Sequence, residues 1–315
     1  MKVFKQLLHS SFKSNETEEW LDIHFTRPVG LVFALLWQRL GVSPNAVTLL
    51  SVVLGAAAGY MFYFTDLAHN LAGVALLVLA NLCDSTDGQL ARLTHQTSAL
   101  GRALDGFSSE LWFFCIYLAL ALRLDGQFMP YTDVEWGIWI WALAAVSGLI
   151  GHSSQSSLSD YYRQIHLYFL QGNKELDSYR SQLAVYEQTP RKAVVLRLYH
   201  YFYAHYCKRQ EARTPAFQQF FALWQQAAAG PQGAAGTAAV REQFLRGSRR
   251  LIPYTNILTF NVRALVLYLT CLGNFPWVYF FFEITVLHAL YIYMHKQHEA
   301  LCRRMSEQLT GQSRQ

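Results

Sequence analysis

The stretch LAGVALLVLANLCDSTDGQLARL, residues 71–93, runs from an apolar segment into a group of charged side chains. The apolar part predicts a membrane-spanning helix, because about 20 mostly apolar residues are needed to cross roughly 30 Å of hydrocarbon. Asp84, Asp87 and Arg92 fall in the same helix, where an ionised group is costly unless it is paired, bound to metal or exposed to water. A group of charges in this position therefore predicts a functional site.

The composition of the 315-residue chain is typical of a membrane protein. Hydrophobic residues make up 52% of it and charged residues 15%, compared with roughly 25% charged residues in soluble domains. The five cysteines show no CxxC pair and no zinc-like spacing. We therefore expect neither a disulfide framework nor a cysteine metal site.

Six stretches are long and apolar enough to span the bilayer. They cover approximately residues 44–64, 70–92, 99–122, 135–153, 252–272 and 274–295. A shorter apolar segment, Pro28–Leu40, is bounded by arginines and predicts a helix lying in the membrane interface. The predicted fold is an all-α membrane protein: six transmembrane helices with an N-terminal interfacial helix and a cytoplasmic helical insert.

The distribution of Lys and Arg predicts the orientation, because cytoplasmic loops carry an excess of both. Residues 1–43 contain five, residues 154–250 contain thirteen and the tail after Tyr293 contains four, whereas the loops 65–69, 124–134 and 273–276 contain none. Six crossings with both termini in the cytoplasm satisfy this count. We divide the chain accordingly into 1–43 (N-terminus and interfacial helix), 44–153 (spans one to four), 154–250 (cytoplasmic insert) and 251–315 (spans five and six with the tail).

Within the insert, two aromatic segments predict amphipathic helices that rest on the cytoplasmic leaflet: VVLRLYHYFYAHYCKR, residues 194–209, and FQQFFALWQQ, residues 217–226. The segment AAAGPQGAAGTAAV, residues 227–240, predicts a flexible linker. Basic and aromatic residues also occur together in nucleic-acid-binding proteins. Beside six spans we favour the membrane surface and expect no nucleic acid partner.

Helical spacing brings the charged residues of spans two and three together. Asp84, Asp87, Gly88 and Ala91 stand at i, i+3, i+4 and i+7 and so share one helix face. Gly101, Asp105 and Ser109 stand at i, i+4 and i+8 and also share one face. If the two helices pack side by side, three carboxylates converge and require cations between them. Hard oxygen ligands suit Mg²⁺ or Mn²⁺. The alternatives are a structural polar network and an ion path through a transporter.

The same residues resemble a family signature. Asp84-Ser-Thr-Asp87-Gly88-Gln-Leu-Ala91-Arg92, then eight residues and Gly101-Arg-Ala-Leu-Asp105, matches seven of the eight fixed positions of the CDP-alcohol phosphatidyltransferase motif. Six spans with an interfacial helix also resemble that family, whereas the insert 154–250 is longer than the connections of its compact members. In the first span, Asn45 and Thr48 are interpreted as helix caps, although the resemblance suggests that they lie near the nucleotide.

The resemblance implies a role for each matching residue. Asp84, Asp87 and Asp105 would bind metal, with two Mg²⁺ or Mn²⁺ ions, and Arg92 would face the diphosphate of a CDP-linked donor. Together with Arg92, the CDP pocket would be shaped by Gly88, Ala91 and Gly101. The resemblance also implies a homodimer as a possible assembly.

The eighth position departs from the motif. Ser109 stands where the family has its fourth aspartate, usually assigned as general base, and a hydroxyl cannot accept a proton at neutral pH as a carboxylate does. The neighbouring Glu110 points roughly 140° away from Asp105 on an ideal helix, and a π-bulge would bring it round. We take Ser109 and Glu110 as the candidate catalytic residues; a phosphate of the acceptor, a water molecule or His152 are the alternative proton acceptors.

The function that follows is a phosphotransferase of lipid synthesis at the cytoplasmic side of the membrane, with CMP as the leaving group. Either CDP-diacylglycerol donates to a small polar alcohol, or a CDP-linked head group is donated to a lipid alcohol. The alternative from another class is a catalytically silent homologue that binds CDP-lipid as a scaffold or sensor, which Ser109 supports. Arg263 and Glu283, within the last two spans, are expected to pair with each other; Arg263 facing an acceptor phosphate is the alternative.

The predicted topology can be tested by cysteine labelling in intact cells. Cysteines introduced between residues 154 and 250 should not react with a membrane-impermeant reagent, because thirteen basic residues hold this segment in the cytoplasm. Cysteines in the loop 124–134 serve as the positive control. Labelling of the insert from outside would contradict both the topology and the location of the active site.

Overall fold

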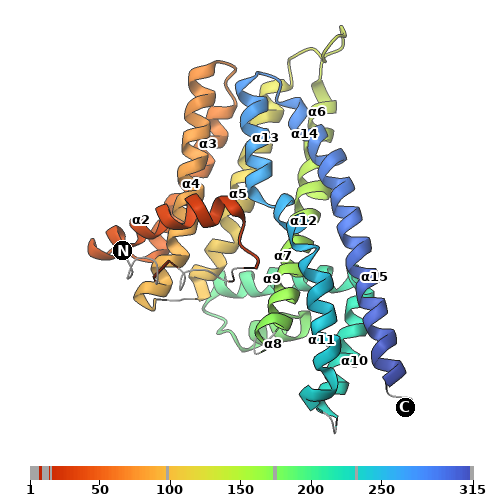
Figure 1. The fold of residues 1–315 in the computed structure, drawn as a ribbon. Coiled ribbons are helices and arrows are strands. Elements are labelled where there is room, and N and C mark those ends of the chain that lie inside the picture. The colour runs from red at the N-terminus through yellow and green to blue at the C-terminus, as the bar shows by residue number, and fades with distance from the viewer. Residues whose placement is uncertain are drawn as a thin grey trace. The chain divides into compact units, whose positions relative to one another are not determined.

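The computed structural model describes residues 7–8, 14, 16–96, 99–172, 176–230 and 233–312. Within these ranges the chain folds into helices and contains no strand (Figure 1). The helices before the insert are η1 (Asp22–Thr26), α2 (Arg27–Arg39), α3 (Pro44–Phe62), α4 (Leu67–Thr94), α5 (Ala99–Leu124), α6 (Gly137–Ala145), η2 (Val146–His152) and α7 (Ser153–Gln171). Those that follow are α8 (Tyr179–Gln188), α9 (Val194–Arg213), α10 (Pro215–Ala229), α11 (Gly233–Arg249), α12 (Ile252–Ile257), α13 (Phe260–Leu272), α14 (Trp277–Phe282), η3 (Glu283–Leu287) and α15 (His288–Gln312). The elements η1, η2 and η3 are π-helical.

Six helical stretches in the described residues are long and apolar enough to cross a membrane, which confirms the predicted number. They are Pro44–Phe62, Leu67–Thr94, Leu104–Leu124, Gly137–Gln171, Ile252–Leu272 and Trp277–Gly311. The fourth and sixth continue well beyond the predicted ends. Polar residues such as Ser153 and His295 mark those extensions in the sequence, and they lower the hydropathy on which the prediction depended without interrupting the helix.

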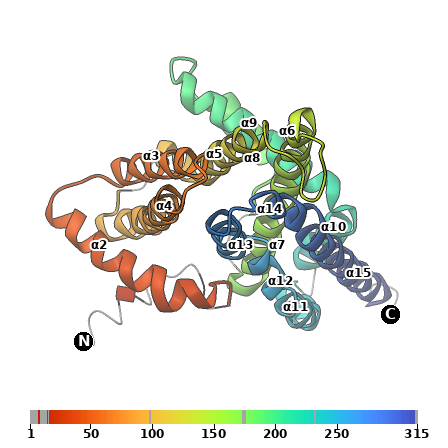
Figure 2. The same ribbon diagram turned by 90° about the horizontal axis from the view of Figure 1, so that it is seen from above.

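The chain divides into two compact units. The first comprises residues 1–153 and 260–286, and the second comprises residues 154–259 and 287–315. In the first unit α3 packs against α4 and α5, and α2 lies across α4, as Figure 1 and the view from above in Figure 2 show. The predicted site residues between 84 and 110 therefore belong to the first unit alone.

The helix α2 packs closely on side chains of α4 at Gly30. A Cβ at Gly30 would lie 2.8 Å from Gln89 Oε1, so a larger residue here would require the end of the Gln89 side chain to move. Gln89 Nε2 in turn donates to the Arg27 carbonyl over 3.0 Å. The opposite face of α2 exposes Val32, Phe33 and Leu36. An apolar exposed face agrees with a helix in the membrane interface, and that location stays a prediction.

The second unit contains the predicted helices of the insert. Residues 194–209 lie in α9 and residues 217–226 in α10, so both segments are helical as expected. The linker predicted for residues 227–240 is wrong: α10 continues to Ala229, and α11 begins at Gly233 with Thr237 and Val240 buried. Alanine is the best helix former, and the apolar residues spaced along α11 give it a face to bury. These two effects outweigh the glycines that suggested flexibility.

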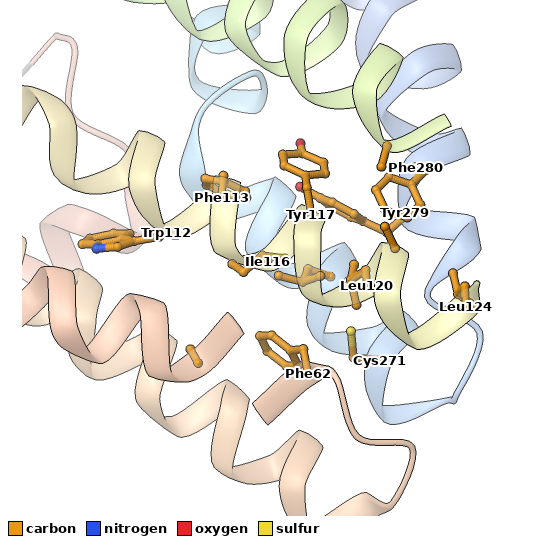
Figure 3. Packing of buried hydrophobic residues seen from close by; sticks show 14 of the residues in the cluster. Phe62, Trp112, Phe113, Ile116, Tyr117, Leu120, Leu124, Cys271, Tyr279 and Phe280 are labelled. Carbon is orange, nitrogen blue, oxygen red and sulfur yellow. The ribbon is translucent and has the colours of Figure 1, made fainter. Parts of the chain in front are cut away.

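Aromatic and aliphatic side chains of α5 form the centre of the core in the first unit. Figure 3 shows this row packing against side chains from α3, α13 and α14. The residues labelled there are Phe62, Trp112, Phe113, Ile116, Tyr117, Leu120, Leu124, Cys271, Tyr279 and Phe280. This packing fixes α5, which carries half of the candidate site.

Ionised side chains hold helices together at two places in the apolar interior, the Arg263–Glu283 pair and Arg123. Glu283 is fully buried and lies 2.5 Å from Arg263 Nη1, which confirms the predicted pair. Glu283 also accepts hydrogen bonds from Tyr117, from Ser147 over 2.5 Å and from Tyr279 over 2.7 Å. Four elements thus meet at one carboxylate, and each hydroxyl offsets part of its lost hydration.

The other group, Arg123, was not predicted as a tertiary contact because it stands at the end of its span. Its Nη1 donates to the Phe62 carbonyl and to Asn70 Oδ1, both over 2.9 Å, and its Nη2 donates to Asn274 Oδ1 over 2.7 Å. One buried guanidinium thereby ties the end of α3 to the start of α4 and to the turn between α13 and α14.

The Arg263–Glu283 pair predicts an asymmetric response to substitution. Arg263→Met should lower the free energy of unfolding by about 3–5 kcal/mol, because it leaves a carboxylate buried without its counter-charge. Adding Glu283→Gln should recover most of that loss, since glutamine is neutral and still accepts hydrogen bonds. The measurement is the unfolding midpoint in detergent, with the exposed Arg39→Met as the matched control. A double variant no more stable than Arg263→Met would contradict the pair as described.

Candidate functional site

Three carboxylates from two neighbouring helices converge at one point. Asp84 and Asp87 project from α4 and Asp105 projects from α5, and one oxygen of each lies within 4.8 Å of the others. The convergence predicted from helical spacing is therefore confirmed. Asp87 is buried, Asp84 is half-buried and Asp105 is exposed. Exposure therefore increases across the cluster from Asp87 to Asp105.

The most deeply buried of the three, Asp87, is held by a hydroxyl group from α3. Thr48 donates a hydrogen bond to Asp87 Oδ2. The cap of α3 is Ser43, whose side chain accepts from the Ala46 amide over 3.3 Å. The interpretation of Asn45 and Thr48 as caps is thus wrong, because the helix begins at Pro44, so Asn45 is its second residue and Thr48 lies more than a turn inside it. Thr48 orients a carboxylate of the cluster instead.

Asp84 is held from the facing helix. Ser108 Oγ lies 2.7 Å from Asp84 Oδ1 and 2.8 Å from the Asp105 carbonyl oxygen. Ser108 is buried, and its hydroxyl therefore links the two helices that supply the carboxylates. Sequence reasoning missed it, although a serine three residues after Asp105 and beside an acidic cluster marks the position.

The residues expected to shape a CDP pocket lie on α4 and at the start of α5. A Cβ at Gly88 would stand 3.5 Å from Arg92 Nη1, so the guanidinium passes directly over this glycine. Arg92 is exposed, whereas Gly88, Ala91 and Gly101 are half-buried. The structure places the exposed Arg92 guanidinium near the carboxylates. Contact of these four residues with a nucleotide stays a prediction.

Ser109 and Glu110 follow one turn later on α5. The helix is α-helical from Ala99 to Leu124, so the π-bulge that would bring Glu110 to the Asp105 face is not there. Glu110 is half-exposed, and its Oε1 lies 4.0 Å from His152 Nε2. A π-helical segment occurs instead at η2 (Val146–His152), which ends on that histidine. The catalytic roles of Ser109 and Glu110 stay predictions.

The three carboxylates fit a divalent cation. Like charges at this separation repel strongly in a low-dielectric setting, and the two described hydrogen bonds, from Thr48 and Ser108, are neutral donors that do not cancel the charge. Carboxylate oxygens are the ligands that Mg²⁺ and Mn²⁺ prefer. These residues supply a cluster of oxygens from which such a site can be built.

Comparison with known proteins agrees with this site. Residues 41–153 match the family model of the CDP-alcohol phosphatidyltransferases. The archaetidylinositol phosphate synthase of Pyrococcus horikoshii is 37% identical over 83 residues, which are 26% of this chain and 43% of that protein. The enzyme of the same name from Aeropyrum pernix is 30% identical over 109 residues, 31% of this chain and 55% of that protein.

A third relative, the bifunctional IPC transferase and DIPP synthase of Aquifex aeolicus, is 29% identical over 115 residues, 36% of this chain and 24% of that protein. The chain thus spans about half or less of the length of these relatives. No solved structure matches it significantly. The carboxylate cluster between two apolar helices could hold a metal ion, and it lies inside the segment 41–153 that matches the CDP-alcohol phosphatidyltransferase family model.

Replacing Asp87 should remove the metal site without unfolding the chain. Asp87→Asn keeps the shape and the contact with Thr48 but removes one of three negative charges, so CDP binding should lose its dependence on Mg²⁺ or Mn²⁺. The measurement is binding of CDP to purified protein over a metal titration, with the exposed Asp133→Asn as the matched control. Unchanged metal dependence in a folded Asp87→Asn protein would rule out this cluster as the metal site.

Proposed function

We propose that the chain is a divalent-metal-dependent phosphotransferase of lipid synthesis. It transfers a phosphatidyl or phospho-alcohol group from a CDP-linked donor to an alcohol and releases CMP. The observation that carries the proposal is the convergence of Asp84, Asp87 and Asp105 within 4.8 Å, inside the segment that matches the family.

In this reaction the hydroxyl oxygen of the acceptor forms a bond to the phosphorus of the transferred group. The bond from that phosphorus to the bridging oxygen breaks, its electron pair stays on CMP, and the hydroxyl proton leaves the acceptor. Cations held by the cluster would polarise the diphosphate and offset the charge on the departing CMP. Thr48 and Ser108 keep Asp87 and Asp84 oriented, and Arg92 offers a further positive charge to the diphosphate.

Two substrate pairs fit the proposal. In the first, CDP-diacylglycerol donates to a small polar alcohol such as glycerol phosphate, serine or inositol phosphate. In the second, a CDP-linked head group is donated to a lipid alcohol. Two of the relatives carry inositol phosphate in their names, which supports the first pair and makes inositol phosphate its leading acceptor.

We also propose a cellular location and an oligomeric state for the protein. The six apolar helices support a multi-pass protein in the lipid bilayer, and the distribution of Lys and Arg supports cytoplasmic termini with the carboxylate cluster on the cytoplasmic side. There a water-soluble nucleotide can meet a lipid substrate. A homodimer is proposed from the family resemblance.

A second candidate function is a silent homologue that binds CDP-lipid as a scaffold or sensor. Ser109 favours it, because the position that carries a carboxylate in the family motif carries a hydroxyl here. In that case metal and CDP binding persist while transfer does not occur.

An assay of CMP release separates the two functions. Purified protein should release CMP in a metal-dependent manner from one donor and acceptor pair in a panel that crosses CDP-diacylglycerol, CDP-ethanolamine and CDP-choline with glycerol phosphate, serine, inositol phosphate and diacylglycerol. Ser109→Ala should lower the rate little, since the hydroxyl is not the proton acceptor. Glu110→Gln should lower it by about 10²-fold or more, the usual contribution of a general base.

The controls decide between enzyme and silent homologue. Omission of the acceptor distinguishes transfer from hydrolysis of the donor. If the native protein binds CDP but releases no CMP, and Ser109→Asp creates the activity, the silent-homologue function is correct and the proposed function is wrong.

A further inference from the structure

A histidine stands between two glutamates beside the candidate site. His152 Nε2 lies 4.0 Å from Glu110 Oε1, and His152 Nδ1 lies 3.9 Å from Glu283 Oε1. All three residues belong to the first unit. Glu110 is half-exposed, whereas only 6% of the His152 side chain and none of Glu283 is exposed. The line therefore runs from the half-exposed Glu110 into the fully buried interior at Glu283.

Glu283 and His152, at the inner end of this line, are each held by contacts with neighbouring elements. Glu283 is held by Arg263 and by hydroxyl groups from three elements. The His152 ring also packs on Phe113, with ring centroids 4.4 Å apart. His152 ends the π-helical segment η2, and π-helical turns of this kind are frequent at functional sites. The structure thus presents the ring to two carboxylates at once.

The separations distinguish this ring from an ordinary buried histidine. Buried polar atoms are almost always hydrogen-bonded, yet among the described residues His152 Nδ1 has no hydrogen-bond partner. The groups that face the ring are Glu110 and Tyr117 from α5, Glu283 from η3, and behind it Arg263 and Tyr279. The nearest carboxylate oxygens, at 4.0 Å and 3.9 Å, lie beyond hydrogen-bond distance of the two ring nitrogens.

The outer end of the line lies on the same helix as Asp105, a candidate metal ligand. Glu110 follows Asp105 by five residues, which is about 7.5 Å along the helix axis and roughly 140° around it, so a bridging water would have to link Glu110 to an acceptor bound at the carboxylates. Glu110 is also adjacent to Ser109, the position at which the family has its missing carboxylate. A glutamate side chain with one oxygen toward His152 leaves its other oxygen for that bridging water.

We propose that Glu110 and His152 together accept the proton of the acceptor hydroxyl, with Glu283 as the residue that positions the ring. This inference rests on the proposed phosphotransferase function and supplies the step that Ser109 cannot perform. The proton passes from the hydroxyl oxygen through the bridging water to Glu110, whose half-exposed side chain then turns toward His152, so that Oε1 closes the 4.0 Å gap and shares the proton with Nε2. It returns to water through the half-exposed Glu110 after CMP has left, so the pair is restored without any other reactant.

The test compares Glu110→Gln and His152→Gln with the native protein in the CMP-release assay. Each should lower kcat by at least about 10²-fold while CDP binding and its metal dependence remain unchanged. The double variant should be no slower than the slower single variant, because the two residues hold one proton. The matched controls are Glu135→Gln and His69→Gln, both exposed and distant in sequence from the site.

A further readout separates loss of a proton acceptor from structural damage. In both variants the rate should rise in proportion to hydroxide concentration, whereas the native rate should not, because only the variants depend on solvent to take the proton. An acceptor analogue with a more acidic, fluorinated alcohol should likewise recover part of the variant rate. The unfolding midpoint of Glu110→Gln should match that of the native protein, since this side chain is half-exposed.

The outcomes are distinguishable. No CMP release by the native protein would overturn the proposed function and this inference with it. A native protein that releases CMP, with Glu110→Gln and His152→Gln at native rates, would overturn this inference alone. A third outcome would also overturn this inference: Glu110→Gln has the native rate, while His152→Gln is slow, unfolds at a lower midpoint and does not respond to hydroxide. His152 would then be a packing residue.

Discussion

The cost of placing an ionised side chain within an apolar helix is the constraint on which the first unit depends. The chain meets it in different ways. Glu283 receives a counter-charge from Arg263 and three hydroxyl groups, and Arg123 donates to a carbonyl and two amide oxygens. These contacts join distant segments of the chain, because each charge finds its partners on other helices. Asp84, Asp87 and Asp105 are different: neutral hydroxyl groups orient two of them, and the three carboxylates converge on a point where a cation could bind.

That difference explains how one set of helices provides both stability and a site. The apolar row along α5 packs against its neighbours and fixes the helix, while the end of α5 near Asp105 is open to solvent. Ser108 connects this end to α4. In the proposed function, a water-soluble nucleotide binds at carboxylates whose positions are set by helices long and apolar enough to cross a bilayer. The gradient from buried Asp87 to exposed Asp105 also leaves one side of the cluster for exchangeable ligands.

Sequence alone predicted the six spans, the convergence of the three aspartates and the Arg263–Glu283 pair, because each depends on a local period or on the cost of an unpaired charge. It missed Thr48, Ser108 and Arg123 as tertiary partners, since serine and threonine are as common in packing between helices as in binding. The prediction of a linker over residues 227–240 was wrong because it gave more weight to the glycines than to the helical preference of alanine. The relation of His152 to Glu110 depends on the register of η2, and a π-helical turn leaves no periodic pattern in the sequence.

The central claim is that the three carboxylates hold the divalent metal against a CDP diphosphate. The most direct measurement is a structure of the protein with CDP and Mn²⁺, in which anomalous scattering locates the metal. We expect anomalous density bridging Asp84, Asp87 and Asp105, at about 2.0–2.3 Å from their oxygens, with the diphosphate on the solvent side near Arg92. Manganese density at another group of residues, or a diphosphate bound away from these carboxylates, would contradict the account.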